Sequence, residues 1–341
     1  MASLPPLHGF PTPSFHTSPK ASPLFSRPLP SPAMSSTAAS PTSLPPLTRL
    51  KLAAADIKLA HSVFALPFAL LGAFLARPAD SPAATFAGQL LLIVLCMVAA
   101  RTWAMLVNRL ADRRYDAANP RTQRRILASG KMSPRDAATV AAGSAAVFIA
   151  ATALFYVFFK NPWPLILSVP VLIWIAFYSF TKRFTALCHI FLGGALAASP
   201  LAAAIAIDPA SLAATAALYF LAGMVLFWVA GFDVIYALQD IDFDRRTGLS
   251  SIPARLGPTG AIWTSRLMHA AAFALLILAA RAEPRFGPIF YAAVAAVAVL
   301  LITEHAVLAR RGQAGLNMAF FTINGVVSCV LGGAGILDLC I

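Results

Sequence analysis

The chain has 341 residues, of which 59% are hydrophobic and 11% are charged, and its mean hydropathy is +0.76. Soluble domains hold about 25% charged residues, so this composition excludes a soluble fold and predicts an integral membrane protein. The net charge of +13 does not indicate a nucleic-acid partner, because membrane proteins concentrate Lys and Arg in their cytoplasmic loops. The four cysteines form no Cys-x-x-Cys pair, so neither a zinc site nor a disulfide framework is indicated.

Residues 1–48 are rich in Pro and Ser and contain no Asp or Glu. Such a segment buries too little apolar surface to fold alone, so we expect a disordered N-terminal extension, followed by a membrane domain over residues 49–341. Two further interpretations stay open. An organellar transit peptide is also rich in Ser and poor in acidic residues, and Met34 offers a second start codon.

Apolar segments long enough to cross a membrane recur from Ala55 to the C-terminus. A hydrocarbon core of about 30 Å requires about 20 helical residues. Nine segments meet that length, so we expect an all-α polytopic membrane bundle of nine transmembrane helices. The expected spans are residues 57–76, 85–108, 135–159, 162–181, 186–207, 212–238, 260–280, 286–309 and 317–338.

Basic residues are distributed unevenly among the connections between these spans. Lys and Arg gather after the second, fourth, sixth and eighth spans, whereas the other connections hold few. Because cytoplasmic loops carry the excess of Lys and Arg, we expect the N-terminus and these four connections in the cytoplasm and the C-terminus outside. The expected location is the bacterial inner membrane, with an organellar membrane as the alternative.

The second span ends in the sequence NRLADRRYD, which places Asn108, Asp112 and Asp116 four residues apart. Side chains at this spacing share one helical face, where like charges disfavour the helix. The chain has only 13 acidic residues, so two of them on one face indicate a function that needs clustered carboxylates.

A second acidic segment, YALQDIDFDRRTG, follows the sixth span and repeats the spacing of four with Asp240 and Asp244. Asp233 lies seven residues before Asp240, and therefore on nearly the same helical face. Counting Asp233 and Asp242, six of the 13 acidic residues lie within or just before these two windows. Both windows lie at helix ends that the basic loops place on the cytoplasmic side.

Carboxylates clustered at a membrane surface attract cations. Mg²⁺ is usually held by one or two carboxylates, water and substrate phosphates, and arginine binds phosphate oxygens through two parallel hydrogen bonds. The arginines beside the two acidic motifs are Arg109, Arg113, Arg114, Arg245 and Arg246. The combination predicts a metal-bridged diphosphate site; the alternative is a set of surface ion pairs, each worth at most about 1 kcal/mol.

Polar residues inside the expected spans extend this site. Arg101 lies seven residues before Asn108, where a lone charge is costly unless it faces a cavity or a partner. Asp233 lies at a similar depth, so the two either neutralise each other or contact a substrate. His61, His189 and Asn324 are weaker candidates, because each stands alone in the sequence.

These residues resemble the UbiA superfamily of membrane prenyltransferases, which carry an NxxxDxxxD motif after the second helix and a DxxxD motif after the sixth. The resemblance covers residues 50–341 and implies a nine-helix bundle that binds an isoprenoid diphosphate through Mg²⁺. The metal ligands it implies are Asn108, Asp112, Asp116, Asp240 and Asp244, and the catalytic residues are Asp112, Asp240 and Asp233. The candidate substrate-binding residues are Arg101, Arg109, His61 and, in the family-like segment YSFTKRFT, Tyr178, Lys182 and Arg183.

Three segments resemble two groups within this superfamily, the 4-hydroxybenzoate polyprenyltransferases and the futalosine-route menaquinone prenyltransferases. They are IKLAHSVFALPFALLGA, NRLADRRYDAANPRT and FDVIYALQDIDFDRRTGLSSIPARLG. NPRT and GLSSIPAR favour the menaquinone group, so the expected acceptor is 1,4-dihydroxy-6-naphthoate, with 4-hydroxybenzoate as the alternative. The sequence ASG at residues 128–130 departs from the expected Pro-containing turn, which affects a loop and none of the carboxylates.

The implied reaction is Mg²⁺-dependent electrophilic prenylation of an aromatic acid by a polyprenyl diphosphate dissolved in the bilayer. Phe64, Phe68 and Tyr178 are candidates to stabilise the allylic cation through their ring faces, and Asp240 or Asp233 is expected to take the released proton. A membrane transporter is the alternative from another class, because intramembrane Arg and Asp also mark transport paths. The acidic residues gather at one face instead of along a crossing path, which favours the enzyme.

Overall fold

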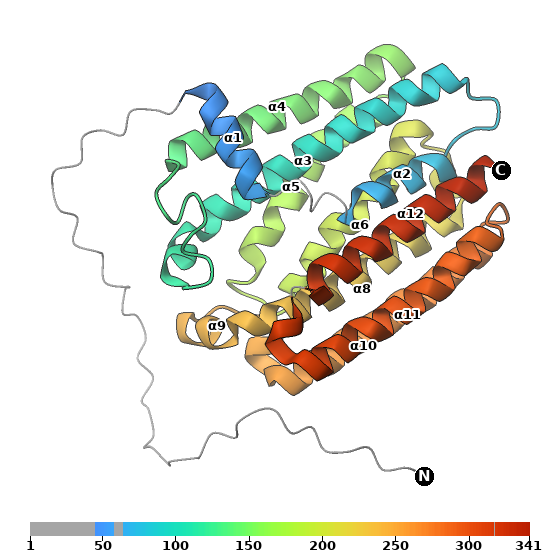
Figure 1. Ribbon diagram of the computed structural model, residues 1–341. Coiled ribbons are helices and arrows are strands. Elements are labelled where there is room, and N and C mark those ends of the chain that lie inside the picture. Colours follow the sequence, from blue (N-terminus) through green and yellow to red (C-terminus); the bar gives the residue numbers. More distant parts are fainter. Residues whose placement is uncertain (1–44, 58–63, 317) are drawn as a thin grey trace, which may run out of the picture. The chain divides into compact units, whose positions relative to one another are not determined.

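The structure is a computed structural model that describes residues 45–316 and 318–341, except for residues 58–63. The expectations for residues 1–44, and for His61, therefore lie outside the described residues. One of two units of the chain runs from Thr42 to Ile341, and every regular element within its described part is a helix (Figure 1).

The helices follow the chain in this order: α1 (Pro46–Ile57), α2 (Leu66–Leu75), α3 (Ala83–Ala118), α4 (Pro134–Phe159), α5 (Trp163–Thr181), α6 (Cys188–Ile207), α7 (Ser211–Ala214), α8 (Ala216–Tyr236), η2 (Ala237–Asp240), α9 (Ile241–Thr247), α10 (Ile252–Ala282), α11 (Pro288–Arg311), η3 (Gly312–Gly315), η4 (Met318–Ile323) and α12 (Asn324–Cys340). Of these, η2 and η3 are 3₁₀-helices and η4 is a π-helix.

An α-helical polytopic bundle is confirmed, but the number of nine spans is not. Eight helices of the described chain are long and apolar enough to cross a membrane. The first expected span, residues 57–76, contains α2, which has 10 residues. At 1.5 Å per residue such a helix covers about 15 Å, half of a hydrocarbon core.

Small residues let the central helices approach closely. A Cβ atom on Gly193 of α6 would lie 2.3 Å from the carbonyl oxygen of Leu226 in α8, and one on Gly72 of α2 would lie 2.3 Å from that of Pro200 in α6. Close contact of this kind stabilises membrane helices, because lipid supplies no hydrophobic force that drives helices together. The helix α6 therefore packs closely against both α2 and α8, and α10 packs against α8.

A buried hydrogen-bond network joins α8, α11 and α12. The indole Nε1 of Trp228 donates to Oδ1 of Asn324 at 2.7 Å, and Nδ2 of Asn324 donates to Oε1 of Glu304 at 3.1 Å. The same Nδ2 donates to the carbonyl of Ala319 at 2.9 Å, inside the π-helix. Asn324 thus links three helices, which is a structural role.

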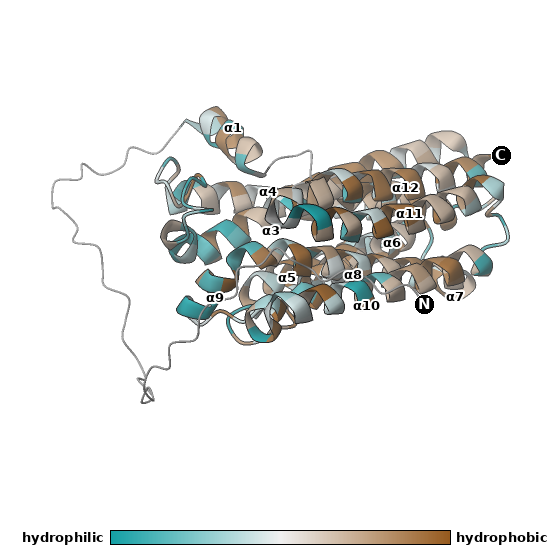
Figure 2. Cartoon of the chain, turned by 60° about the horizontal axis from the view of Figure 1, so that its bottom comes forward, coloured by the Kyte–Doolittle hydropathy of each residue, from teal (hydrophilic) through white to brown (hydrophobic). Residues whose placement is uncertain are grey.

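Hydrophilic residues gather at the end of the bundle where α9 and the α3–α4 connection lie, whereas the long helices are mostly hydrophobic (Figure 2). The helix α3 reaches this end without interruption and carries the first acidic motif on its last turns. The second motif lies on η2 and α9, which follow α8. Both acidic motifs are therefore at one end of the bundle (Figure 1).

Candidate active site

The first acidic motif lies on one face of α3, as its spacing predicts, and its two carboxylates are buried. Asp112 and Asp116 are 2% and 6% exposed, and Nδ2 of Asn108 donates to Oδ2 of Asp112 at 3.3 Å. Burial of adjacent carboxylates is costly unless cations compensate them. The partners of Asp112 are Lys182 Nζ at 2.7 Å and Arg183 Nη2 at 3.2 Å.

The second motif is not one regular α-helix. A 3₁₀ turn over Ala237–Asp240 separates α8 from α9, so Asp240 lies at the start of a new helical segment. Asp244 is anchored differently, because Oγ of Ser251 donates to its Oδ2 at 2.8 Å. Ser251 is also the N-cap of α10 and accepts from the amide of Ala254 at 3.2 Å, which fixes the Asp244 carboxylate to the start of that helix.

The α3–α4 connection joins the two motifs. Arg121 Nη2 lies 2.5 Å from Oδ2 of Asp240, and Nδ2 of Asn119 donates to Oδ1 of the same carboxylate at 2.9 Å. Four residues on, Arg125 Nη1 lies 2.7 Å from Oδ1 of Asp116. One loop therefore supplies the cations for a carboxylate of each motif.

We call the basic clamp the four side chains that pair with the motif carboxylates: Arg121, Arg125, Lys182 and Arg183. The sequence identified Lys182 and Arg183 as candidate substrate contacts. It used Arg121 and Arg125 only as basic loop residues that indicate the orientation of the protein in the membrane. Arg121 pairs with Asp240, 119 residues away, and Arg125 reaches back from the loop to Asp116, so neither pairing leaves a signal in the spacing along a single helix.

Two members of the basic clamp lie outside the membrane spans and have altered acidities. Burial disfavours the charge of Arg121, but the hydrogen bond and the negative charge of Asp240 outweigh it and raise the pKa of Arg121 above its usual value. Burial, with the positive charge of Arg109, lowers the pKa of Arg125, against the opposing effect of Asp116. Both guanidiniums stay protonated at neutral pH, so the loop presents two fixed positive charges.

Asp233 pairs with a histidine and not with Arg101. Its Oδ2 lies 2.6 Å from Nδ1 of His189, a side chain that is 3% exposed, whereas the carboxylate is 23% exposed. The amide of Ile252 approaches Nε2 of His189 at 3.4 Å, so the ring is fixed on both sides. The sequence placed His189 among the weak candidates, because a contact between α6 and α8 is invisible in either segment alone.

Arg101 forms no ion pair with any carboxylate of the described chain, and its Nε atom is buried without a hydrogen-bond partner there. Of the two alternatives for Arg101 and Asp233, mutual neutralisation is therefore not what the structure shows. Arg109, the other arginine on this part of α3, is directed to Asp56 and Asn108, at 2.8 and 3.2 Å.

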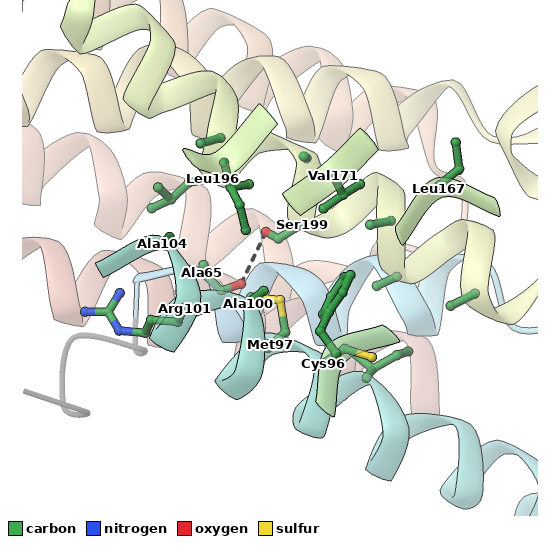
Figure 3. Close-up of a pocket in the computed structure, with 18 of the residues that line it drawn as sticks. Ala65, Cys96, Met97, Ala100, Arg101, Ala104, Leu167, Val171, Leu196 and Ser199 are labelled. Atoms are coloured by element: carbon green, nitrogen blue, oxygen red, sulfur yellow. Dashed lines mark hydrogen bonds between the residues drawn. The ribbon is translucent and has the colours of Figure 1, made fainter. Parts of the chain in front are cut away.

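An apolar cavity of about 360 Å³ lies between α3, α4, α5 and α6. Figure 3 shows Arg101 at one end of the labelled lining residues and Leu167 at the other. Along α5 the lining runs from Pro164 to Tyr178, about 21 Å at 1.5 Å per residue. Arg101 and Tyr178 line one end of the cavity, which we call its polar end. Tyr178 precedes Lys182 by one helical turn, so this polar end lies next to the basic clamp.

Two of the three aromatic candidates lie elsewhere in the fold. Phe68 is completely buried and contacts the ring of Trp228 at a centroid distance of 5.5 Å, as a packing residue does. Phe64 joins a cluster with Phe232 and Phe320, at centroid distances of 5.7 and 5.9 Å. Only Tyr178 of the three lines the cavity.

The donors of the two motifs fit a magnesium–diphosphate complex better than a metal bound by protein alone. Within the described ranges, no group of three or more His, Cys, Asp or Glu side chains is arranged to hold a metal ion. Mg²⁺ is commonly bound by one or two carboxylates together with substrate phosphates. Carboxylate and amide oxygens on two facing motifs, with cations beside them, supply that chemistry.

Comparison with known proteins gives the same assignment as the motifs. The UbiA prenyltransferase family profile matches residues 65–326. The chain is 31% identical over 244 residues to a 4-hydroxybenzoate octaprenyltransferase of Nitrosomonas eutropha, a match that covers 72% of this chain and 82% of that protein. A protein of the same name from Nitrosospira multiformis is 31% identical over 246 residues, with 72% and 81% covered.

Solved structures share the fold. An apo UbiA homologue from Aeropyrum pernix K1 superposes with a TM-score of 0.72 at 35% identity, over 82% of this chain and 98% of that one. A UbiA homologue from Archaeoglobus fulgidus, bound to DMAPP and Mg²⁺, gives a TM-score of 0.61 at 16% identity, over 85% and 99%. With its motifs, its fold and relatives matched over four fifths of their length, this chain belongs to the UbiA prenyltransferase family and is an aromatic prenyltransferase.

Proposed function

We propose that this enzyme transfers a polyprenyl group from a polyprenyl diphosphate to a ring carbon of an aromatic acid, with Mg²⁺ as cofactor. The observation that supports the proposal most directly is the position of the basic clamp. It pairs with carboxylates of both motifs next to the polar end of an apolar cavity. A diphosphate head and a prenyl tail need these two environments side by side. Membership of the family leaves the transporter alternative without support.

In this proposal the basic clamp changes partners when the donor binds. Asp112, Asp116 and Asp240 each accept a charge-assisted contact of 2.5–2.7 Å from a clamp residue. Diphosphate oxygens are stronger partners for arginine and lysine, because they offer several acceptors and more negative charge. Transfer of the clamp to the diphosphate frees the carboxylates for a divalent cation.

Mg²⁺, held by Asn108, Asp112, Asp116, Asp240 and Asp244 with the diphosphate, would act as a Lewis acid that neutralises the leaving group as its C–O bond lengthens. Lys182 and Arg183 stabilise the same developing charge through direct contacts. The donor's tail would occupy the cavity, whose lining is nearly all apolar.

The aromatic acid would bind at the polar end of that cavity. Arg101 supplies a guanidinium that no described carboxylate occupies, and a carboxylate is the partner that a guanidinium fits best. Tyr178 lines the same end and offers its ring face to the allylic cation. Asp233, oriented by His189 at 2.6 Å, is the base that takes the proton released when the ring regains aromaticity. Arg109 acts on Asn108 in this scheme, and His61 remains a candidate substrate contact from the sequence alone.

Two acceptors share the required carboxylate and hydroxyl groups. The names of the relatives from Nitrosomonas eutropha and Nitrosospira multiformis favour 4-hydroxybenzoate, and this is the acceptor we propose first. The segments NPRT and GLSSIPAR favour 1,4-dihydroxy-6-naphthoate, which the sequence placed first. The motifs do not separate the two, because they bind the diphosphate and not the acceptor.

The test is an acceptor screen with purified full-length protein in detergent, one polyprenyl diphosphate and each acid in turn, with product detected by mass. Prenylated 4-hydroxybenzoate supports the first proposal, and preferential prenylation of the naphthoate reverses the order. Absence of product with both acids, from a folded protein, would overturn the assignment of an aromatic acid as acceptor. Full turnover in EDTA would exclude the metal. We further propose the bacterial inner membrane as the location, with the site on the cytoplasmic side, because basic loops surround it.

A further inference from the structure

Asp56 on α1 contacts the first acidic motif, although 53 residues separate it from Arg109. Its Oδ2 lies 2.8 Å from Nε of Arg109, and the two side chains are 8% and 9% exposed. Its Oδ1 accepts from the backbone amide of Ile126 at 3.2 Å. Asp56 therefore holds both a residue of the motif helix and the loop that carries the arginines of the basic clamp.

The contact between Asp56 and Arg109 extends to Asn108 and Asp112, two of the proposed metal ligands, which form part of the metal–diphosphate face. Nη1 of Arg109 donates to Oδ1 of Asn108 at 3.2 Å, and Nδ2 of Asn108 donates to Oδ2 of Asp112 at 3.3 Å. An amide oxygen has two lone pairs, so Oδ1 can accept from Arg109 and still face a cation. The chain Asp56–Arg109–Asn108 thus fixes the orientation of the Asn108 amide relative to Asp112.

Charge gives Asp56 a second effect. A buried guanidinium that loses its carboxylate is strongly destabilised and takes another anionic partner where one is near. Asp112 is the next carboxylate along this chain of contacts. By pairing with Arg109, Asp56 therefore prevents Arg109 from forming an ion pair with Asp112. In the proposed function, Asp112 has to be free of such pairs when the donor binds.

The attachment of α1 does not depend on Asp56 alone. Arg49 Nε lies 2.9 Å from Oδ1 of Asp136 on α4, and Ala53, 2% exposed, packs in a cluster with Leu106 and Met132. The side chain of Asp136 pairs with Arg49 and accepts from Ser133, and neither of these is a residue of the motif. Removing the Asp56–Arg109 pair and removing the Arg49–Asp136 pair can therefore be compared. The comparison distinguishes an effect on the site from an effect on the docking of α1.

We propose that Asp56 is a positioning residue for the metal–diphosphate face, acting through Arg109 on Asn108. This inference rests on the proposed function, since it concerns the same face. It adds α1 to the helices that contribute to that face. Loss of a residue that orients a metal ligand commonly weakens metal binding by about 10- to 100-fold.

The test compares Asp56→Asn with Asp136→Asn in the full-length protein. Asp56→Asn keeps the size of the side chain and an oxygen for the amide of Ile126, but removes the charge. Mg²⁺ is titrated calorimetrically in the presence of a non-reactive S-thiolodiphosphate analogue of the donor, so that binding is measured without turnover. We expect the Mg²⁺ dissociation constant to rise by about 10-fold or more in Asp56→Asn and to stay unchanged in Asp136→Asn. In transfer assays, KM for the donor rises and KM for the acceptor does not.

A double variant identifies the route. If Asp56 acts through Arg109, then Asp56→Asn/Arg109→Gln binds Mg²⁺ no more weakly than Arg109→Gln alone. This double variant removes both buried charges, so it keeps the test valid should Asp56→Asn fail to fold. Asp56→Glu, which retains the charge, should recover part of the affinity.

Equal shifts in Asp56→Asn and Asp136→Asn would overturn the inference in favour of simple docking, as would additive losses in the double variant or an unchanged Mg²⁺ constant in folded Asp56→Asn. A wild-type protein that binds Mg²⁺ with the analogue but prenylates neither acid would contradict the proposed acceptor and leave the positioning result valid. A wild-type protein that binds no Mg²⁺ would overturn both.

Discussion

Asp240 and Asp242 lie two residues apart in the sequence DIDFD, but only Asp240 contacts the basic clamp. Arg121 and Asn119 hold its carboxylate at 2.5–3.0 Å, whereas Asp242 is exposed and its described contact uses its backbone oxygen. The two residues have the same chemistry and neighbouring positions. They therefore form a matched pair for testing which carboxylates hold the metal.

We predict that Asp240→Asn lowers kcat by about 100-fold or more, as the removal of one electrostatic stabiliser of a transition state does. Asp242→Asn should keep wild-type kcat and donor KM. Both proteins are compared by initial rates of transfer and by their melting temperatures in detergent. Equal activity of the two variants would remove Asp240 from the metal site.

The contact between Asp233 and His189 leads to a second prediction at this scale. Asp233→Asn should lower kcat by about 100-fold, within the range that general bases contribute, without change in KM for the donor. His189→Gln, which keeps a donor for the carboxylate, should retain more activity than His189→Leu. If the pH–rate profile of Asp233→Asn matches that of the wild type, Asp233 is not the base.

The sequence identified most of the acidic side chains of the site but few of their partners. Asn108, Asp112 and Asp116 were recognisable because one helix fixes their relative positions, and α3 confirms that they share a face. The 3₁₀ turn before α9 was not predicted, since four residues of tighter helix change no pattern of apolar residues. Arg121, Arg125, His189 and Asp56 were missed in their observed roles, because each meets its partner from another segment.

At the scale of elements, glycines decide how closely α6 approaches α8 and α2. Gly193 is buried against the backbone of Leu226, whereas Gly143 on α4 has no heavy atom within 4 Å of an added Cβ. A methyl group at Gly193 must displace a helix, because the atom it meets is a carbonyl oxygen. The same methyl group at Gly143 meets open space.

We predict that Gly193→Ala destabilises the protein by about 1–3 kcal/mol, the usual cost of overpacking. Gly143→Ala should leave stability unchanged or raise it slightly, since alanine favours the helix over glycine. Thermal unfolding in detergent, followed by tryptophan fluorescence, measures the difference. A Gly193→Ala melting temperature equal to that of Gly143→Ala would show that α6 can shift without loss.

The helix count shows the limit of hydropathy at this scale. Residues 57–76 are predominantly apolar and long enough for a span, but the helix α2 within them covers only Leu66–Leu75. Hydropathy measures transfer to lipid and does not report where a helix begins. The other expected spans each coincide with a long helix, although α10 starts at Ile252, eight residues before the expected position, because Ser251 caps it there.

For the whole molecule, the distribution of basic loops predicts the orientation in the membrane. Cys340 lies at the C-terminus and is exposed, so it reports on the side expected to be outside. In a variant that retains only this cysteine, a membrane-impermeant maleimide should label intact spheroplasts. A new cysteine at Arg124, on the α3–α4 connection, should be labelled only after the membrane is permeabilised. The reverse pattern would place the active site outside.

Removal of residues 1–41 tests the expectation that the N-terminal extension takes no part in the reaction. The unit that contains the described helices begins at Thr42, so α1, with Asp56, is retained in the shortened protein. We predict unchanged kcat and unchanged Mg²⁺ dependence in purified protein. A loss of activity in a folded truncated protein would assign those residues a part in the reaction.

The sequence by itself determined the membrane class, the helical architecture and the two acidic motifs, because composition and helical periodicity are local properties that a single segment carries. The resemblance of those motifs to a known family then indicated the family, which the family profile confirms. Only the tertiary structure decided which groups neutralise the motifs and which helix positions them. Arg121 meets Asp240 across 119 residues, Asp56 meets Arg109 across 53, and His189 meets Asp233 across 44. Such pairs depend on how helices pack, and no periodicity within either partner's segment records them.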